Sequence, residues 1–204
     1  MQMNYNESQT RKNLMRAFAG ECQSRQRYYQ AALIAQQQKL IGLERMFRFT
    51  AEQEERHAMV FWKLMKAGSG SSVDISAGFP ADVFDEIQQL LDASANEEDK
   101  EFSKVYPDFA RIAREEGFTE AAEKISMIAE IENIHRARFQ YYAGLYKADM
   151  LFRSNDTEQC WMCLNCGHIH KGSEPPTECP VCSSARGYFI REEEAAFTSC
   201  DVVG

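Results

Sequence analysis

The chain has 204 residues, and its formal net charge at pH 7 is −8. This acidic balance argues against a nucleic-acid partner and provides no polybasic membrane anchor. We expect no signal peptide, because residues 1–11 are polar, and no membrane span, because no apolar run approaches the ~20 residues that a span requires. Five of the seven cysteines lie within 160–182 with the spacing of a metal site. That usage favours a reducing, cytoplasmic location over a secreted disulfide scaffold.

Four helical patterns follow one another along the chain, beginning with a pair over 1–67. The first pattern covers about 6–38, and the second begins after a short break near 39–42. The segment 68–80 is rich in Gly and Ser and is too long for a tight turn. We therefore interpret it as a crossover between two helix pairs.

The second pair begins after the crossover. The third helix is expected to start near Ala81, directly after Pro80. Pro107 predicts a kink or break after Tyr106. The fourth helix is expected over about 118–147.

Acidic side chains interrupt the apolar stripe of each helix. On the fourth helix, Glu132 and His135 lie one turn apart on the face that carries the apolar residues. An unpaired carboxylate in a core costs several kcal/mol or takes up a proton, and a metal ion removes that difficulty. The same pattern, Ala-Glu-x-Glu-x-x-His, recurs at 51–57 and places Glu54 and His57 on the apolar face of the second helix. Two such motifs, each with its Glu and His on the apolar face of a helix, favour a metal site.

The first and third helices each contribute one more carboxylate. Glu21 precedes Glu54 by 33 residues, and Glu98 precedes Glu132 by 34, which indicates a duplicated helix pair. The predicted stripe of the first helix runs through Leu14, Phe18, Glu21, Arg25, Tyr28, Ala32 and Ala35.

This inventory predicts a mainly α, ferritin-like four-helix bundle with a di-metal centre. One Glu from each of two helices and a Glu-x-x-His from each of the other two is the general pattern of ferritin-like di-iron and di-manganese proteins. Four carboxylates balance the charge of two divalent ions, so the sequence favours two metals over one. The mixed oxygen and nitrogen donors suit iron.

Three further residues share faces with these carboxylates. Glu101 follows Glu98 by one turn, and the acidic run around it is equally well read as a solvated surface. Tyr28 and Tyr106 lie on the faces of Glu21 and Glu98, where core packing is the more common role for a tyrosine.

The composition changes after Cys160. Two C-x-x-C knuckles, Cys163/Cys166 and Cys179/Cys182, predict a tetrathiolate site for zinc or a single iron. Cys160 and Cys163 also form a C-x-x-C pair, but Gly167 after Cys166 suits the sharp turn around a metal. So small a module needs the metal to hold it together. Its apolar residues, expected to pack around the site, are Trp161, Ile169, Tyr188, Phe189 and Phe197.

Over nearly its whole length the chain resembles the rubrerythrin family. The resemblance rests on 17–21 with Arg27 and Tyr28, on the Glu-x-x-His, Glu-x-x-Glu and Glu-x-x-His motifs, and on a rubredoxin-like tail. It implies a ferritin-like domain over 1–150, a linker over 151–158 and a rubredoxin-like domain over 159–204. Glu97 departs from the family pattern, which commonly has Gly before this Glu.

The resemblance further implies a non-haem di-iron peroxidase of oxidative-stress defence. Hydrogen peroxide would be the substrate, and electrons would come from an NAD(P)H-dependent reductase through the rubredoxin-type iron. The residues that would bind the two irons in the oxidised form are Glu21, Glu54, Glu98, Glu101, Glu132 and His135. In the reduced form His57 would replace Glu101, and Tyr28 and Tyr106 would hydrogen-bond a ligand or the bound peroxide. The family architecture also implies a homodimer.

Two other functions compete with the peroxidase. A ferritin-like ferroxidase or iron-handling protein would use the same bundle site, with a structural zinc ribbon as its tail. A helical interaction module would leave the buried carboxylates unexplained. The metal in the tail discriminates between the first two, because zinc cannot change oxidation state.

Overall fold

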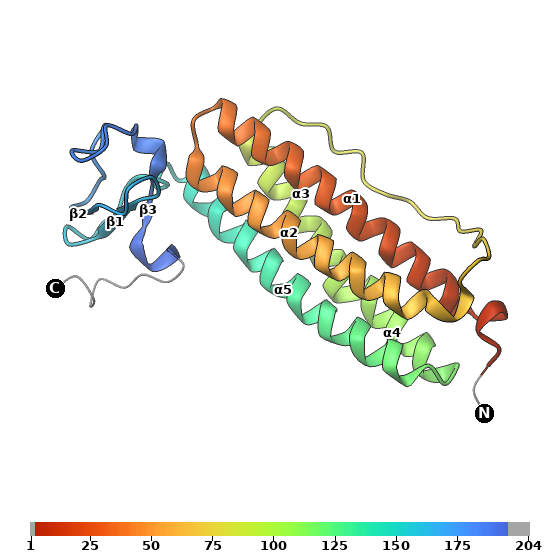
Figure 1. Ribbon diagram of the computed structural model, residues 1–204. Coiled ribbons are helices and arrows are strands. Elements are labelled where there is room, and N and C mark those ends of the chain that lie inside the picture. Colours follow the sequence, from red (N-terminus) through yellow and green to blue (C-terminus); the bar gives the residue numbers. More distant parts are fainter. Residues whose placement is uncertain (1–2, 196–204) are drawn as a thin grey trace.

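The computed structural model describes residues 3–195, which form an elongated helical bundle with a small β-module at one end (Figure 1). Helices α1 (Gln9–Gln37) and α2 (Ile41–Leu64) form one antiparallel pair. In the other pair, α3 (Ile87–Lys100), a π-helical segment (Glu101–Val105) and α4 (Tyr106–Glu115) follow one another and pack on α5 (Thr119–Lys147). The predicted mainly α bundle with a long crossover is confirmed.

Hydrogen bonds from outside the helix define the start of α1. The hydroxyl of Ser8 accepts from the N–H of Arg11, which is a standard N-cap. The carboxylate of Glu116, at the end of α4, accepts from the N–H groups of Gln9 and Thr10, both at 2.8 Å. A carboxylate at this end of a helix satisfies free N–H groups and complements the helix dipole.

Two apolar clusters fill the two ends of the bundle. One cluster includes Phe47, Leu91 and Phe139, and the other includes Phe61 and Ile125. Both contain many alanines, which let the helices approach closely. Between the clusters the buried residues are charged, so the core is interrupted halfway along the bundle.

The third helix begins later than the sequence predicts. It starts at Ile87 and not near Ala81, because the crossover continues in irregular form up to Glu86. Side chains of α1 bind the crossover: Gln23 donates to the carbonyl oxygen of Pro80, and Arg27 lies 3.4 Å from the carboxylate of Asp82. These contacts hold residues 80–82 against α1 in place of another helical turn.

Pro107 does not break the third helix. The π-helical segment just before it lets the chain continue into α4, with the N–H of Tyr106 donating to the carbonyl oxygen of Glu101, five residues earlier. Proline is then tolerated in the first turn of α4, where its missing N–H costs little.

The predicted position of Arg25 in the buried stripe of α1 is wrong. Arg25 is half-exposed and lies 3.8 Å from Glu55, while its neighbour Ser24 is buried.

The β-module is a three-stranded antiparallel sheet of order β2-β1-β3. Its strands are β1 (Cys160–Cys163), β2 (Ile169–Lys171) and β3 (Phe189–Arg191). Trp161 is fully buried, stacks under the guanidinium of Arg191 and donates its ring N–H to the carbonyl oxygen of Gly172. Phe189 and Tyr188 pack with it, whereas Phe197 lies outside the described residues.

The module meets the bundle at the turn between α1 and α2. Gly187 lies so close to this turn that a Cβ atom there would stand 1.7 Å from the carbonyl oxygen of Lys39. Arg45 donates to the carbonyl oxygen of Leu164 at 3.0 Å, and Tyr141 donates to Glu194 at 2.7 Å. Close backbone contact at Gly187 therefore fixes the position of the module.

Among residues 3–195, no helix has both the length and the apolar character needed to cross a membrane.

Candidate metal centres

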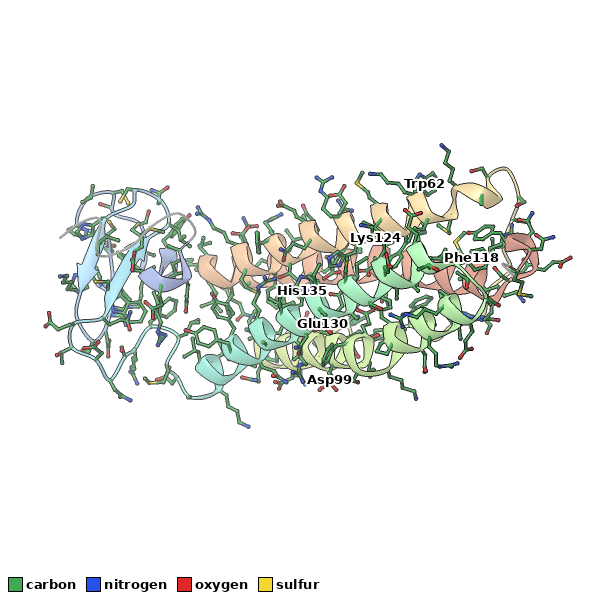
Figure 2. The ribbon with its side chains drawn as sticks, turned by 90° about the horizontal axis from the view of Figure 1, so that it is seen from below. Trp62, Asp99, Phe118, Lys124, Glu130 and His135 are labelled. Atoms are coloured by element: carbon green, nitrogen blue, oxygen red, sulfur yellow. The ribbon has the colours of Figure 1, made fainter. Side chains whose placement is uncertain are left out.

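Ionisable side chains from all four long helices come together inside the bundle. One of them, His135, lies about midway along it (Figure 2). These side chains form two groups in which the donor atoms lie within 4.8 Å of one another. One group is Glu21, Glu54, His57 and Glu132, and the other is Glu54, Glu98, Glu132 and His135. Glu54 and Glu132 belong to both groups, as expected for carboxylates that bridge two cations.

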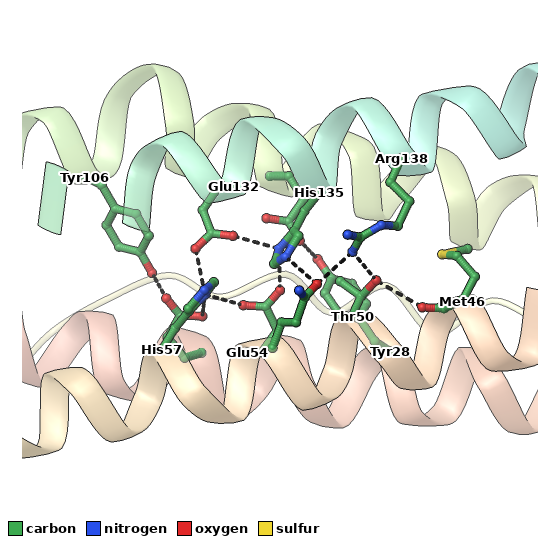
Figure 3. Close-up of polar contacts among 12 residues, drawn as sticks. Tyr28, Met46, Thr50, Glu54, His57, Tyr106, Glu132, His135 and Arg138 are labelled. Atoms are coloured by element: carbon green, nitrogen blue, oxygen red, sulfur yellow. Dashed lines mark hydrogen bonds and ion pairs between the residues drawn. The ribbon is translucent and has the colours of Figure 1, made fainter. Parts of the chain in front are cut away.

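The distances within each group are short (Figure 3). Nδ1 of His135 lies 2.8 Å from Oε1 of Glu54 and 2.8 Å from Oε2 of Glu132. Nδ1 of His57 lies 3.0 Å from Oε1 of Glu132, 3.2 Å from Glu54 and 3.8 Å from Glu21. Each histidine therefore points its Nδ1 at the two shared carboxylates.

The buried atoms of this cluster fit metal ions. Five carboxylate oxygens of Glu21, Glu54, Glu98 and Glu132, together with Nδ1 of His135, have no hydrogen-bond partner among the described residues. Unsatisfied polar atoms in a core are costly, and charged ones more so. Two divalent cations would satisfy these atoms and balance four negative charges.

The pKa values of the cluster also indicate that its buried carboxylates lack enough positive partners. Burial raises the pKa of Glu21 to about 8, and the charge of Glu54 adds to the rise. Burial also raises the pKa values of Glu98 and Glu132 well above the usual carboxyl range. Without cations, therefore, several of these carboxyl groups would take up protons.

The two histidines differ in their environment. Burial lowers the pKa of His135 to about 3. Burial also opposes protonation of His57, but the nearby carboxylates of Glu132, Glu21 and Glu54 outweigh it and raise the pKa of His57. A neutral His135 is the form that binds a metal.

Two tyrosines donate to the ends of the cluster. The hydroxyl of Tyr28 donates to Oε1 of Glu98, and that of Tyr106 donates to Oε1 of Glu21. Burial, reinforced by the surrounding carboxylates, raises both phenol pKa values, so the hydroxyls keep their protons. Tyr28 and Tyr106 thus pack in the core and also orient one carboxylate each.

Glu101 lies beside the cluster and outside both groups. It is buried, with 8% of its surface exposed, so its interpretation as a solvated acidic residue is wrong. Burial and the charges of Glu21 and Glu98 raise its pKa. The structure thus has His57 among the shared carboxylates, and Glu101 at their edge.

A hydrogen-bonded chain behind His135 was not anticipated from the sequence. Nε2 of His135 lies 3.1 Å from Oε1 of Gln53, and Arg138 donates to the same oxygen at 3.0 Å and to Thr50 at 2.9 Å. Because this oxygen only accepts, Nε2 must carry the hydrogen, and the lone pair of Nδ1 faces Glu54. Such an outer partner fixes the ring for metal binding. Gln53 precedes Glu54 directly, but its spacing gave no signal of this contact.

The four-cysteine group lies in the β-module. The sulfur atoms of Cys163, Cys166, Cys179 and Cys182 lie within 4.8 Å of one another, with separations of 3.7 and 3.6 Å for two pairs. A tetrahedral site with metal–sulfur bonds of about 2.3 Å requires sulfur atoms roughly 3.8 Å apart. The structure thus brings together the four cysteines selected from the sequence, and Cys160 is not in this group.

Each knuckle turns through a residue in the left-handed region. Gly167 follows Cys166 with φ of +78°, and Ser183 follows Cys182 with φ of +59°. The predicted sharp turn at Gly167 is present, and in the second knuckle a serine adopts the same conformation at some cost in strain.

Comparisons with known proteins agree with this geometry. A family model described as rubrerythrin matches residues 12–142, and one described as the rubredoxin-like domain of rubrerythrin matches residues 161–190. The chain belongs to the rubrerythrin family. A rubrerythrin of Clostridium perfringens is 37% identical over 183 residues, covering 89% of this chain and 93% of the relative. A rubrerythrin of Nitratidesulfovibrio vulgaris is also 37% identical, with the same coverage.

Solved structures of a related protein share the fold. A structure of nigerythrin in the fully reduced, all-ferrous state is 28% identical, with a TM-score of 0.60, over 93% of this chain and 92% of the other. This rubrerythrin therefore has a carboxylate and histidine di-metal site in its bundle and a four-cysteine metal site in its module.

Proposed function

We propose that this rubrerythrin is a non-haem di-iron peroxidase that reduces hydrogen peroxide to two waters, using two electrons and two protons. The observation that carries the proposal is the pair of donor groups sharing Glu54 and Glu132, with unsatisfied buried atoms aimed between them. Family membership and a donor set of carboxylates and imidazoles favour iron. Two bound irons would supply the two electrons that cleave the O–O bond.

The side chains divide into distinct tasks. Glu54 and Glu132 would hold both ions, while Glu21 with His57 and Glu98 with His135 would each hold one. The hydroxyls of Tyr28 and Tyr106 carry protons at the edge of the cluster and donate them in hydrogen bonds to Glu98 and Glu21.

The exchange of His57 for Glu101 is part of the proposal. Ferric iron prefers an additional anionic oxygen and ferrous iron a neutral imidazole, so the exchange would limit the change in site charge. The support for the exchange is that His57 belongs to a donor group and that Glu101 is buried beside it.

Electrons would reach this site through the four-cysteine centre. We propose that this centre holds redox-active iron and accepts electrons from an NAD(P)H-dependent reductase in the cytoplasm. Its support is the four-sulfur geometry within the same chain as the bundle site. Zinc in the same position would give only structural support.

We also propose that the protein is a homodimer. Met127, Ile134 and Tyr141 are exposed by 59%, 58% and 44% and recur every seven residues along α5. Apolar residues at this spacing form one stripe, and such a stripe is typical of a helix that packs against another helix.

Anaerobic reduction followed by one equivalent of hydrogen peroxide tests the peroxidase. Both iron sites are followed by visible absorption, and the metals are quantified in the same sample. We expect the four-cysteine iron to be oxidised only after the bundle irons have reacted with peroxide. A colourless, zinc-only four-cysteine site overturns the electron relay, and rapid oxidation of added Fe(II) with slow peroxide turnover would instead indicate the ferroxidase.

A further inference from the structure

A narrow pocket leads from the surface to the edge of the metal cluster. It has a volume of about 100 Å³ and lies between α1, the crossover and the segment that joins α3 to α4. Its wall includes Ala17 and Gly20 of α1, Phe79 of the crossover, and Glu101 and Tyr106. A space of this size holds a few water-sized molecules.

Glu101 connects this pocket to the cluster. It is 8% exposed, whereas Glu21, Glu54, Glu98 and Glu132 are completely buried. Tyr106, the other cluster neighbour in the wall, donates its hydroxyl hydrogen bond to Glu21. A small molecule inside the pocket would therefore stand next to the group containing Glu21 and His57.

Gly20 keeps this pocket open. A Cβ atom at position 20 would lie 3.8 Å from Oε1 of Glu101 and 3.8 Å from Cε1 of Phe79, so it would contact both side chains and reduce the space between them. The backbone of Gly20 is helical, and glycine in a helix interior costs stability relative to alanine. Space, and not backbone conformation, is thus the property that glycine provides here.

Hydrogen bonds to the residues before and after Phe79 in the sequence hold it at the mouth of the pocket. Nε2 of Gln23 donates to the carbonyl oxygen of Pro80 at 2.6 Å, and Nε of Arg16 donates to that of Ser76 at 3.0 Å. The crossover consequently runs along α1 as a long trace (Figure 1). The ring of Phe79 is 43% exposed, as expected for a side chain at a rim.

We propose that this pocket is the entry route of the peroxide, and that Phe79 and Gly20 limit the size of the hydroperoxide that can reach the cluster. The proposal deepens the peroxidase function and rests on it. Hydrogen peroxide has two heavy atoms and fits the pocket, whereas an aryl-substituted hydroperoxide does not. Phe79 and Gly20 are thus specificity-determining residues that do not contact the metals.

The test changes the mouth of the pocket in both directions. Phe79→Ala widens it and Phe79→Trp narrows it, while Val83→Ala is the matched control, since Val83 is 92% exposed in the same crossover and does not line the pocket. The first readout is the association rate of nitric oxide, a small neutral probe, with the reduced iron-loaded protein. The second is the ratio of kcat/KM for cumene hydroperoxide to that for hydrogen peroxide.

We expect Phe79→Ala to raise the cumene hydroperoxide ratio by at least about tenfold, the scale on which a pocket discriminates by size. Phe79→Trp and Gly20→Ala should slow nitric oxide association, and the Cβ added at Gly20 makes only ordinary contacts, so the fold is retained. If both Phe79 variants match Val83→Ala in both readouts, the entry route is wrong. Nitric oxide rates that follow the substitutions in a protein without peroxide turnover would support the route and refute the peroxidase. High peroxide turnover would support the peroxidase, but unchanged kcat/KM ratios and nitric oxide association rates in the variants would refute the entry route.

Discussion

The close approach of Gly187 to the bundle gives a quantitative test of how the β-module is held. A methyl group at position 187 would stand 1.7 Å from the carbonyl oxygen of Lys39 and 2.9 Å from its carbonyl carbon. Ordinary contacts need about 3.5 Å, so Gly187→Ala forces the two parts roughly 2 Å apart. The turn cannot yield easily, because Lys39 is already at φ of +61° and its N–H donates to Gln36.

The added methyl group overpacks the junction, so Gly187→Ala should lower the free energy of unfolding by about 1–3 kcal/mol. Separation of the parts would also weaken the hydrogen bond from Arg45 to Leu164 and the contact between Gly42 and Ile190. We expect faster amide hydrogen exchange over the α1–α2 turn and slower electron transfer from the four-cysteine centre to the bundle site. The four cysteines should still bind their metal, because all four belong to the β-module and none comes from the bundle.

The matched control is Gly144→Ala, where an added Cβ meets nothing within 4 Å. Gly144 lies inside α5, so this substitution should raise stability by up to about 1 kcal/mol. Unchanged exchange protection and electron transfer in Gly187→Ala would refute the reasoning. They would show that the module tolerates a shift of this size without losing its contacts.

Three further predictions follow from the described contacts. Glu132→Ala should lower metal occupancy in the bundle and peroxide turnover together, with normal metal in the four-cysteine site; full bundle occupancy by elemental analysis would remove Glu132 from the cluster. Glu116→Gln should lower the free energy of unfolding by about 1 kcal/mol at pH 7, because weaker acceptors face Gln9 and Thr10. If the protein is the proposed homodimer, Ile134→Glu should convert it to a monomer in analytical ultracentrifugation, and an unchanged mass would exclude the α5 stripe as the interface.

The pH dependence of the Glu116 effect has a definite sign. Burial alone would raise the pKa of Glu116, but hydrogen bonds from Thr10 and Gln9 outweigh it, so its pKa is lowered in the folded protein. Such a group stabilises the fold at pH values above its unfolded pKa, and the contribution is lost as pH falls through the folded value. The stability difference between the parent protein and Glu116→Gln in urea unfolding should therefore shrink below about pH 4. A constant difference down to pH 3 would contradict the assignment.

Helical spacing predicted the centre of the bundle well, because burial and periodicity are linked along a single helix. Glu54, His57, Glu132 and His135 recur at positions where only apolar residues are stable without a partner, and all four are buried. The two cysteine knuckles were similarly readable, since their ligands are close in sequence.

Contacts between distant segments could not be read in this way. The start of α3 at Ile87 depends on hydrogen bonds from Gln23 and Arg27 of α1 to the crossover. The partner of His135, Gln53, comes from another helix and lies at the edge of the predicted stripe. Such contacts depend on how the helices pack against one another. The periodicity of a single helix predicts which of its faces is buried, but not which residues of another helix that face meets.

The π-helical segment Glu101–Val105 contains one more residue than a regular α-helical connection between α3 and α4 would need, and the orientation of α4 depends on it. Removing one residue from it would restore regular i→i−4 hydrogen bonding and would look harmless to a local measure of helicity. Every side chain beyond the deletion would, however, rotate by about 100° around the helix axis. Tyr106 would leave Glu21, and Ala110 and Ala113 would turn out of the core. A shortened chain could thus gain helical regularity while losing the match between its two halves.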